Sequence, residues 1–169
     1  MLAVVLFGAL LFAQAKLDPD ECAVWQRELS FAQSVENHDA KAFASFLDPG
    51  TVFAAGTDHP AHGADAVLKN WIALIGGKPL RLRWRPNIVN IGGNRNIAIS
   101  TGPYMMEDTR PDAKPKYRVG TFTTIWGRAS TNAPWLVLFD AGGPAATPVD
   151  DLAAAEKFLA QAPAGCPAR

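Results

Sequence analysis

The sequence of 169 residues lacks several features that usually point to a particular activity. Its formal net charge is zero, which argues against a nucleic-acid-binding surface, because such surfaces need an excess of basic residues. It contains no G-x-S-x-G motif, no G-x-G-x-x-G motif and no P-loop, so hydrolysis by a serine nucleophile and nucleotide binding find no support. Its composition, 49% hydrophobic and 19% charged residues, is that of one globular domain with a core.

Long apolar runs are also scarce, and the one that stands out lies at the start of the chain. Residues 2–12 are too few to cross a membrane and are typical of a signal peptide, and the A-x-A sequence at residues 13–15 is a cleavage site. The stretch before the run carries no Lys or Arg, in contrast to most signal peptides. We expect residues 1–15 to be a signal peptide that is cleaved after Ala15, with export to the periplasm or outside the cell and no membrane contact afterwards.

Cysteine is rare, and the two cysteines, Cys22 and Cys166, lie near the two ends of the expected mature chain. An even count in an exported protein favours a disulfide, and two free thiols are the alternative. Because the ends of a domain often lie close together, we expect Cys22 and Cys166 to be bonded. The chain-entropy model predicts a stabilisation of roughly 4–5 kcal/mol for a bond that closes so long a loop.

What the sequence does contain is, first, a set of helix signals in the first half of the chain. Asp-Pro-Asp-Glu at residues 18–21 favours a helix start, and apolar residues then recur at helical spacing as far as Val35. Asp39 can cap a second, short helix, which Asp-Pro-Gly at residues 48–50 would end. A third helix is expected at residues 64–75, with an inward stripe of Val67, Leu68, Trp71, Ile72 and Ile75.

Strand signals dominate the second half of the chain. A short strand is expected at residues 51–55, and a long one at residues 80–91, where apolar residues at first alternate with arginines. A turn at residues 92–95 leads to a returning strand at residues 96–108. Pro103 within that strand suggests an edge position or a bulge, because proline cannot donate a backbone hydrogen bond.

Two further strands are expected close to the end of the chain. Residues 117–128 are rich in β-branched and aromatic residues, and residues 135–139 form a continuous apolar run that predicts a strand buried on both faces. Asp140 follows at the end of this run. A last helix is expected to begin at Thr147-Pro148. Helices first and strands later indicate an α+β fold with helices on one face of a curved sheet.

Five segments in this order carry a resemblance to a known superfamily. They are the opening helix pair, Thr-Val-Phe-Ala-Ala at 51–55, the helix from residue 64, Gly-Thr-Phe-Thr-Thr-Ile-Trp at 120–126, and Trp-Leu-Val-Leu-Phe-Asp at 135–140. Over residues 21–143 the chain resembles the nuclear-transport-factor-2-like (NTF2-like) superfamily, in particular its SnoaL-like (polyketide-cyclase-like) and DUF4440 branches. Members include isomerases, cyclases, hydrolases and non-catalytic binders, so the resemblance does not settle a function.

The resemblance implies a cone-shaped α+β fold with an internal pocket. Three N-terminal helices and a curved, mostly antiparallel sheet would enclose the pocket in a domain at residues 16–146, followed by a C-terminal helix and tail at 147–169. Members of the superfamily often dimerise through the sheet, so a homodimer is expected here. The residues that could bind a small hydrophobic ligand are Trp25, Phe53, Trp71, Trp84, Tyr104, Arg118, Phe122 and Trp126. For each aromatic residue, packing in the core is the alternative.

Asp140 is the first candidate for acid–base chemistry. If Arg118 lies beside it in a buried polar pair, the carboxyl would be held ionised, and the alternative is that Asp140 only caps the turn at Gly142. Ketosteroid isomerases of the superfamily carry a carboxylate base on the first strand. The matching position here is near Ala54, which argues against an isomerase of that type.

His59 is the second candidate, as a general base at the mouth of the pocket. His59, Asp58 and His62 also have side chains of metal-binding type, but their loop fixes no geometry, and we expect no metal and no cofactor. The sequence therefore favours an exported, non-catalytic or weakly catalytic protein that binds a small hydrophobic ligand. The alternatives are an enzyme of cyclase or isomerase type that uses Asp140 or His59, and a purely structural dimerisation module.

Overall fold

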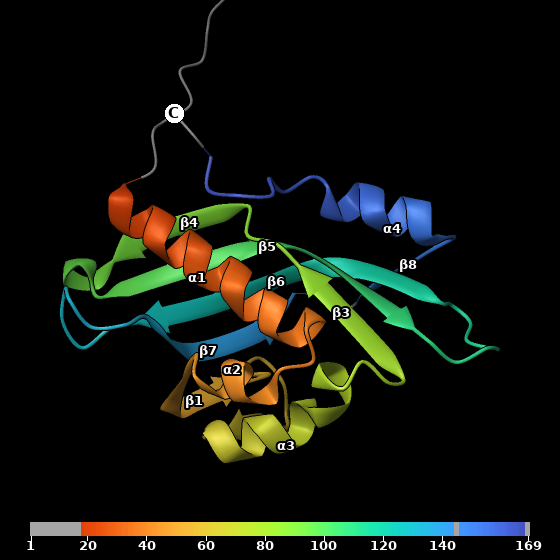
Figure 1. Ribbon diagram of the computed structural model, residues 1–169, viewed down its shortest axis with the longest axis horizontal. Coiled ribbons are helices and arrows are strands. Elements are labelled where there is room, and N and C mark those ends of the chain that lie inside the picture. Colours follow the sequence, from red (N-terminus) through yellow and green to blue (C-terminus); the bar gives the residue numbers. More distant parts are fainter. Residues whose placement is uncertain (1–17, 144–145, 168–169) are drawn as a thin grey trace, which may run out of the picture.

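The computed structural model describes residues 18–143 and 146–167 and has an α+β architecture (Figure 1). The expected signal peptide lies outside the described residues. Helix α1 crosses one face of a curved sheet, and α2 and α3 lie beside β1 on the same side (Figure 1). The elements are α1 (Pro19–Glu36), α2 (Ala40–Ala44), β1 (Leu47–Phe53), β2 (Ala61–His62), α3 (Ala64–Ile75), β3 (Leu80–Trp84), β4 (Ile88–Gly92), the 3₁₀ turn η1 (Gly93–Arg95), β5 (Ile97–Asp108), β6 (Tyr117–Gly127), β7 (Leu136–Gly142), β8 (Thr147–Val149) and α4 (Leu152–Leu159).

The first two helices begin where their capping residues predict, whereas α3 begins after Gly63 without a side-chain cap. Asp18 accepts the backbone N–H of Asp20, while the Glu21 side chain accepts the N–H of Asp18, and together they form a capping box. Asp39 caps α2 by accepting the N–H of Ala42. The prediction that residues 48–50 end the second helix is wrong, because α2 already ends at Ala44 and these residues belong to β1.

The strands form a single curved sheet of mostly antiparallel pairs, which confirms the expected fold class. Its order is β2-β1-β7-β6-β5-β3, with β4 also paired to β5 and β8 paired to β6. The pair β1–β7 is parallel, and all the other described pairs are antiparallel. Strands β5 and β6 are the longest pair, in register from Ile97 opposite Gly127 to Glu107 opposite Tyr117. These two strands form the central part of the concave face.

The long strand predicted at residues 80–91 is in fact two strands that both pair with β5. The chain between them, residues 85–87, contains Pro86 and passes directly over Gly102, where any side chain would collide with the Arg85 carbonyl. Pro103 lies in the central strand β5, so the predicted edge position is wrong. Its carbonyl accepts the N–H of Arg85. The nitrogen of Pro103, which carries no hydrogen, points the same way, toward the gap between β3 and β4, so no sheet hydrogen bond is lost.

The C-terminal third also differs from the sequence-based expectation. Strand β7 runs on to Gly142, and Phe139 is 43% exposed, so this strand is not buried on both faces. Thr147 and Pro148 form β8 beside β6 rather than a helix start. Helix α4 begins only after Asp151, whose side chain caps it.

The main core lies between the early helices and the concave face of the sheet. Phe31 of α1 is at its centre, with ring contacts to Phe43, Phe46, Phe53, Trp84 and Trp126. Ile72 is 63% exposed, so its predicted place in the inward stripe of α3 is wrong. A smaller cluster lies on the opposite face, where α4 covers Met105 and Val119.

The two ends of the described chain are joined covalently. Cys22 and Cys166 form the expected disulfide, with their Cα atoms 5.6 Å apart. The bond connects the first turn of α1 to the tail that follows α4, and the two ends lie near one another in Figure 1. None of the helices in the described ranges is both long enough and apolar enough to cross a membrane.

Candidate ligand-binding site

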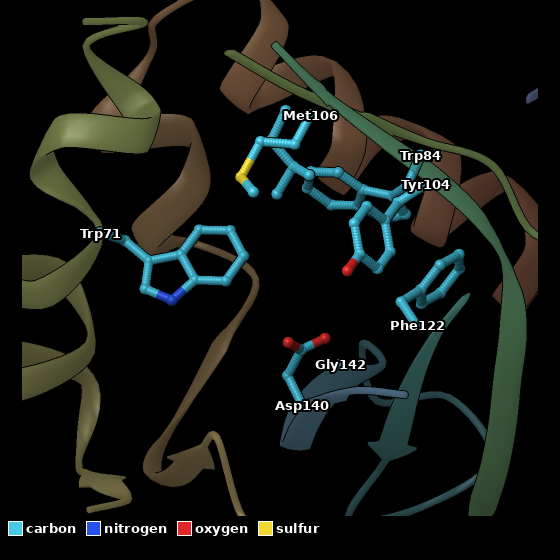
Figure 2. Close-up of a pocket in the computed structure, with 8 residues that line it drawn as sticks. Trp71, Trp84, Tyr104, Met106, Phe122, Asp140 and Gly142 are labelled. Atoms are coloured by element: carbon cyan, nitrogen blue, oxygen red, sulfur yellow. The ribbon is translucent and has the colours of Figure 1, made fainter. Parts of the chain in front are cut away.

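A cavity of about 180 Å³ lies between α3 and the concave face of the sheet (Figure 2). Apart from one acid, its lining is almost entirely apolar. Trp71 comes from α3, and the remaining residues come from β3, β5, β6 and β7. The lining residues are Trp71, Leu82, Trp84, Tyr104, Met106, Phe122, Asp140 and Gly142.

The register of the sheet places these side chains on one face. Residues directly opposite one another on paired strands share a face, and Tyr104 lies opposite Trp84 on one side and Gly120 on the other. The Tyr104 side chain lies over Gly120, where a Cβ atom would come within 2.7 Å of the ring. Gly120 therefore leaves the room that the Tyr104 ring needs at the wall of the cavity.

Asp140 is the acid in the cavity, and its carboxyl faces the open space in Figure 2. Its Oδ2 accepts a hydrogen bond of 2.9 Å from the hydroxyl of Thr124, which is completely buried. Burial raises the pKa of Asp140 to about 7, against the Thr124 hydrogen bond, which lowers it. Asp140 lies within β7, opposite Thr124, rather than in a turn after the strand. The carboxyl can therefore exchange a proton near neutral pH.

The structure does not bring Arg118 to Asp140. No ion pair within 4 Å joins them in the described residues. Arg118 lies opposite Met106 in register, near the start of β6 and six residues before Thr124. Its positive charge contributes to the lowered pKa of Asp108, for which the hydrogen bonds with Arg110 are the larger cause. The predicted buried pair of Arg118 and Asp140 is therefore wrong, and the charge of Arg118 acts on Asp108 instead.

A second acid, Glu28, lies completely buried behind the cavity. Its Oε1 accepts the indole N–H of Trp84 and its Oε2 accepts that of Trp126, each at 2.7 Å. Burial raises the pKa of Glu28 to about 7, the two indole hydrogen bonds lower it, and the nearby charge of Asp140 raises it further. Because Trp84 lines the cavity and is bonded to Glu28, this acid fixes part of the cavity wall.

Glu28 was missed by the sequence analysis, although a signal was present. It lies three residues after Trp25 and four before Ala32, on the inward face of α1. A glutamate on the apolar face of a helix is unusual, because an isolated buried charge is costly. The pattern identified the face but not the two indole partners, which come from β3 and β6.

The predicted ligand-binding residues separate into two groups. Trp71, Trp84, Tyr104 and Phe122 line the cavity. Trp25, Phe53 and Trp126 are instead buried in the core, and Arg118 is not among the lining residues. Three lining residues were not among the candidates, namely Leu82, Met106 and Gly142.

His59 lies on an exposed loop between β1 and β2 and does not line the cavity. Asp58 and His62 are exposed as well. Across residues 18–143 and 146–167, no cluster of three or more His, Cys, Asp or Glu side chains is arranged to hold a metal ion. The structure thus places Asp140, but not His59, at the cavity.

Comparisons with known proteins identify similar folds but indicate no activity. No protein-family model and no curated protein matches the sequence. An NTF2-like protein of unknown function from Pseudomonas putida KT2440 has a similar structure, with a TM-score of 0.59, 16% identity, and coverage of 73% of this chain and 84% of that one. An NTF2-like superfamily protein from Salmonella enterica serovar Typhimurium LT2 has a TM-score of 0.57 and 15% identity, and the match covers 79% of this chain and 94% of that one.

A third similar structure is an NTF2-like protein with a cystatin-like fold from Novosphingobium aromaticivorans. It has a TM-score of 0.54 and 18% identity, and the match covers 82% of this chain and 89% of that one. Similarity at this level of identity extends to the arrangement of helices and strands, and a shared fold hosts many unrelated functions. The function must therefore be argued from the cavity itself.

Proposed function

We propose that this chain, which has the NTF2-like fold, binds a small and largely apolar molecule in the cavity between α3 and the sheet. The observation that carries this proposal is the lining: apolar side chains from one helix and several strands surround a space that contains one carboxyl. Small-molecule sites commonly combine a mostly apolar wall with a few polar groups that orient the ligand. Packing of the core alone does not explain why the carboxyl of Asp140 faces an open space.

The size of the cavity limits the ligand. An apolar cavity of about 150 Å³ is large enough for benzene. The cavity here, at about 180 Å³, therefore suits a molecule of roughly one ring, or one end of a larger molecule that extends out of the opening. The four aromatic side chains Trp71, Trp84, Tyr104 and Phe122 would contact that ring or chain directly.

A variant that fills the cavity tests this proposal. Gly142 lines the cavity opposite Phe122, and a Cβ atom at this position would meet nothing within 4 Å, so we expect the ring in Gly142→Phe to occupy the cavity. Gly92→Phe is the matched control, because a Cβ atom there also meets nothing and β4 lies away from the cavity. Ligand-detected NMR with benzyl alcohol should show binding to the natural protein and to Gly92→Phe, and none to Gly142→Phe. Equal binding by Gly142→Phe would refute the site.

Acid–base catalysis of cyclase or isomerase type is the second candidate function. It is favoured by Asp140, because a carboxyl in an apolar cavity with a pKa of about 7 is matched to proton transfer at neutral pH. His59 has less support, since it is exposed outside the cavity. With a neutral substrate, Asp140→Asn should keep the affinity and abolish turnover. Membership of the SnoaL-like or DUF4440 branch stays a prediction from the sequence.

We also propose that the protein is exported to the periplasm or secreted. The disulfide between Cys22 and Cys166 supports this location, because such bonds persist mainly in oxidising compartments. The intact mass of the protein isolated from its own host should correspond to a chain that starts at Lys16 and contains no free thiol. A full-length chain with two alkylatable thiols would contradict the proposal.

The outer face of the sheet supports a homodimer. Ile97, Ile99 and Phe139 are exposed there, and Ile125 lies between Ile99 and Phe139 in register. We propose that two copies pair through this row of apolar side chains, which α4 leaves uncovered. Light scattering should then give twice the monomer mass, and Phe139→Lys should give a monomer. Ile72→Lys, at an exposed apolar position on α3, is the control that should remain dimeric.

A further inference from the structure

We propose that the ligand of this cavity is an organic amine, bound as its ammonium ion between the carboxyl of Asp140 and the surrounding aromatic rings. The inference rests on the proposed function and adds the chemical class of the ligand. It follows from three features of the site: an acid without a positively charged partner among the described residues, aromatic rings on several sides of that acid, and a small apolar space in contact with both.

The first feature is the unpaired acid. Among the described residues, Asp140 receives one side-chain hydrogen bond, from the Thr124 hydroxyl to Oδ2, and its carboxyl faces the cavity in Figure 2. In the described part of the chain, no Lys, Arg or His nitrogen lies within 4 Å of its carboxyl. A carboxylate that lines an apolar cavity, partly withdrawn from water and without a partner, is unfavourable, and a cation that arrives with the ligand would offset that cost.

The second feature is the arrangement of rings around the acid. Figure 2 shows Trp71 on one side of the space above Asp140, and Trp84, Tyr104 and Phe122 on the other. Trp71 and Trp84 are inclined at 78° with centroids 6.4 Å apart, so their rings border the space in different orientations. The face of an aromatic ring attracts a cation within about 6 Å of its centroid, and tryptophan does so most strongly. A neutral ligand gains no comparable electrostatic attraction.

The groups that face Asp140 determine how binding should depend on pH. These are Glu28 from α1, Tyr104 from β5, and Thr124 from β6. Arg118 lies on the same face of β6 but near the start of the strand, and it forms no ion pair with Asp140. Burial raises the pKa of Tyr104 further above its ordinary value, so its hydroxyl stays neutral. An ammonium ligand prefers ionised Asp140, whose pKa in the empty site is about 7, so affinity should rise as pH increases through that value.

A matched pair of probes tests the proposal. Benzylamine and benzyl alcohol have nearly the same size and shape, and only the amine is positively charged between about pH 6 and pH 8. Titration calorimetry at about pH 8 should give an affinity for benzylamine at least about tenfold higher than for benzyl alcohol. This preference should decrease toward about pH 6, and Asp140→Asn should remove it while binding of benzyl alcohol remains.

The possible results separate this inference from the proposed function. If benzyl alcohol binds as tightly as benzylamine, or if the preference for benzylamine survives in Asp140→Asn, the ammonium assignment is wrong and the apolar site stands. If the affinity for benzyl alcohol rises as pH falls, protonated Asp140 acts as a hydrogen-bond donor to neutral ligands, and the inference also fails. If neither probe binds the natural protein at millimolar concentration, the inference and the proposed function fail together. Gly142→Phe serves as the non-binding reference for both probes.

Discussion

Glu28, which is completely buried, and Asp140, which is partly buried at the cavity wall, lack a positively charged partner in the described residues. Burial raises the pKa of each to about 7, whereas the unfolded chain would titrate near the ordinary values of about 4. Between these values the folded state binds more protons than the unfolded state. The free energy of unfolding should therefore decrease as pH rises from about 4.5 to about 7, and then level off.

Asp108 works in the opposite direction. Its hydrogen bonds with Arg110 lower its pKa to about 2, so its contribution is present above its ordinary pKa and is lost as pH falls below it. Urea unfolding over this range should therefore show maximal stability near about pH 4.5. Glu28→Gln and Asp140→Asn should each flatten the decline toward neutral pH, while Asp58→Asn, at an exposed position, should not. A stability that rises between about pH 5 and pH 7 would contradict this assignment.

The contribution of a hydrogen bond with Glu28 to the free energy of unfolding can be measured by comparing two tryptophans of similar burial. The indole N–H of Trp126 donates to Glu28, whereas that of Trp25 has no partner in the described residues. Trp126→Phe should therefore cost about 1.5–3 kcal/mol more than Trp25→Phe, because it removes a hydrogen bond to a buried acid as well as packing. Chemical denaturation of the two variants at neutral pH gives the difference. Equal losses would mean that the hydrogen bond contributes nothing.

The surroundings of single residues were the feature least predictable from the sequence. Helical spacing identified the inward face of α1, yet it gave no indication that Glu28 would meet two indoles from distant strands. The aromatic candidates were chosen by residue type alone, and type cannot distinguish Trp84 at the cavity wall from Trp126 in the core. Both depend on strand register, which the sequence analysis did not determine.

At the scale of elements, the chain between β3 and β4 passes so close to β5 that it leaves no room for a side chain at residue 102. Gly102→Ala would place a Cβ atom against the Arg85 carbonyl and the Asn87 N–H, which are backbone atoms held by pairing with β5. The substitution should lower the free energy of unfolding by at least about 1–3 kcal/mol, as overpacking does. Gly92→Ala, in open space on β4, should change it by less than about 0.5 kcal/mol. Thermal unfolding of both variants compares them, and equal stability would show that the crossing has room to relax.

The starts of the three early helices were predicted more accurately than the strands, for a physical reason. A helix is specified by local signals, and the caps at Asp18 and Asp39 and the periodicity at residues 64–75 all describe contacts within one element. The apolar pattern at residues 80–91 continues through Pro86, so it did not reveal that the strand changes there. Exposure of Phe139 depends on which face of the sheet the helices cover, and the run at residues 135–139 carries no such information.

At the scale of the whole molecule, the disulfide restricts the chain from end to end. Cys22 and Cys166 are 144 residues apart in sequence, so the chain-entropy model predicts a loss of about 5 kcal/mol when both are replaced by serine. Denaturation of the double variant should show this loss, and reduction of the natural protein should produce the same change. A loss below about 1 kcal/mol would mean that the unfolded chain is already compact without the bond.

The central claim is that the cavity under α3 binds a small molecule, and the indole N–H signals of the five tryptophans test it most directly. Benzyl alcohol can be titrated into ¹⁵N-labelled protein, with each signal assigned from a Trp→Phe variant. The claim predicts that the signals of Trp71 and Trp84 move and saturate, while that of Trp135, which packs against Arg128 outside the cavity, stays in place. Unchanged signals for Trp71 and Trp84, or an equal shift at Trp135, would contradict it.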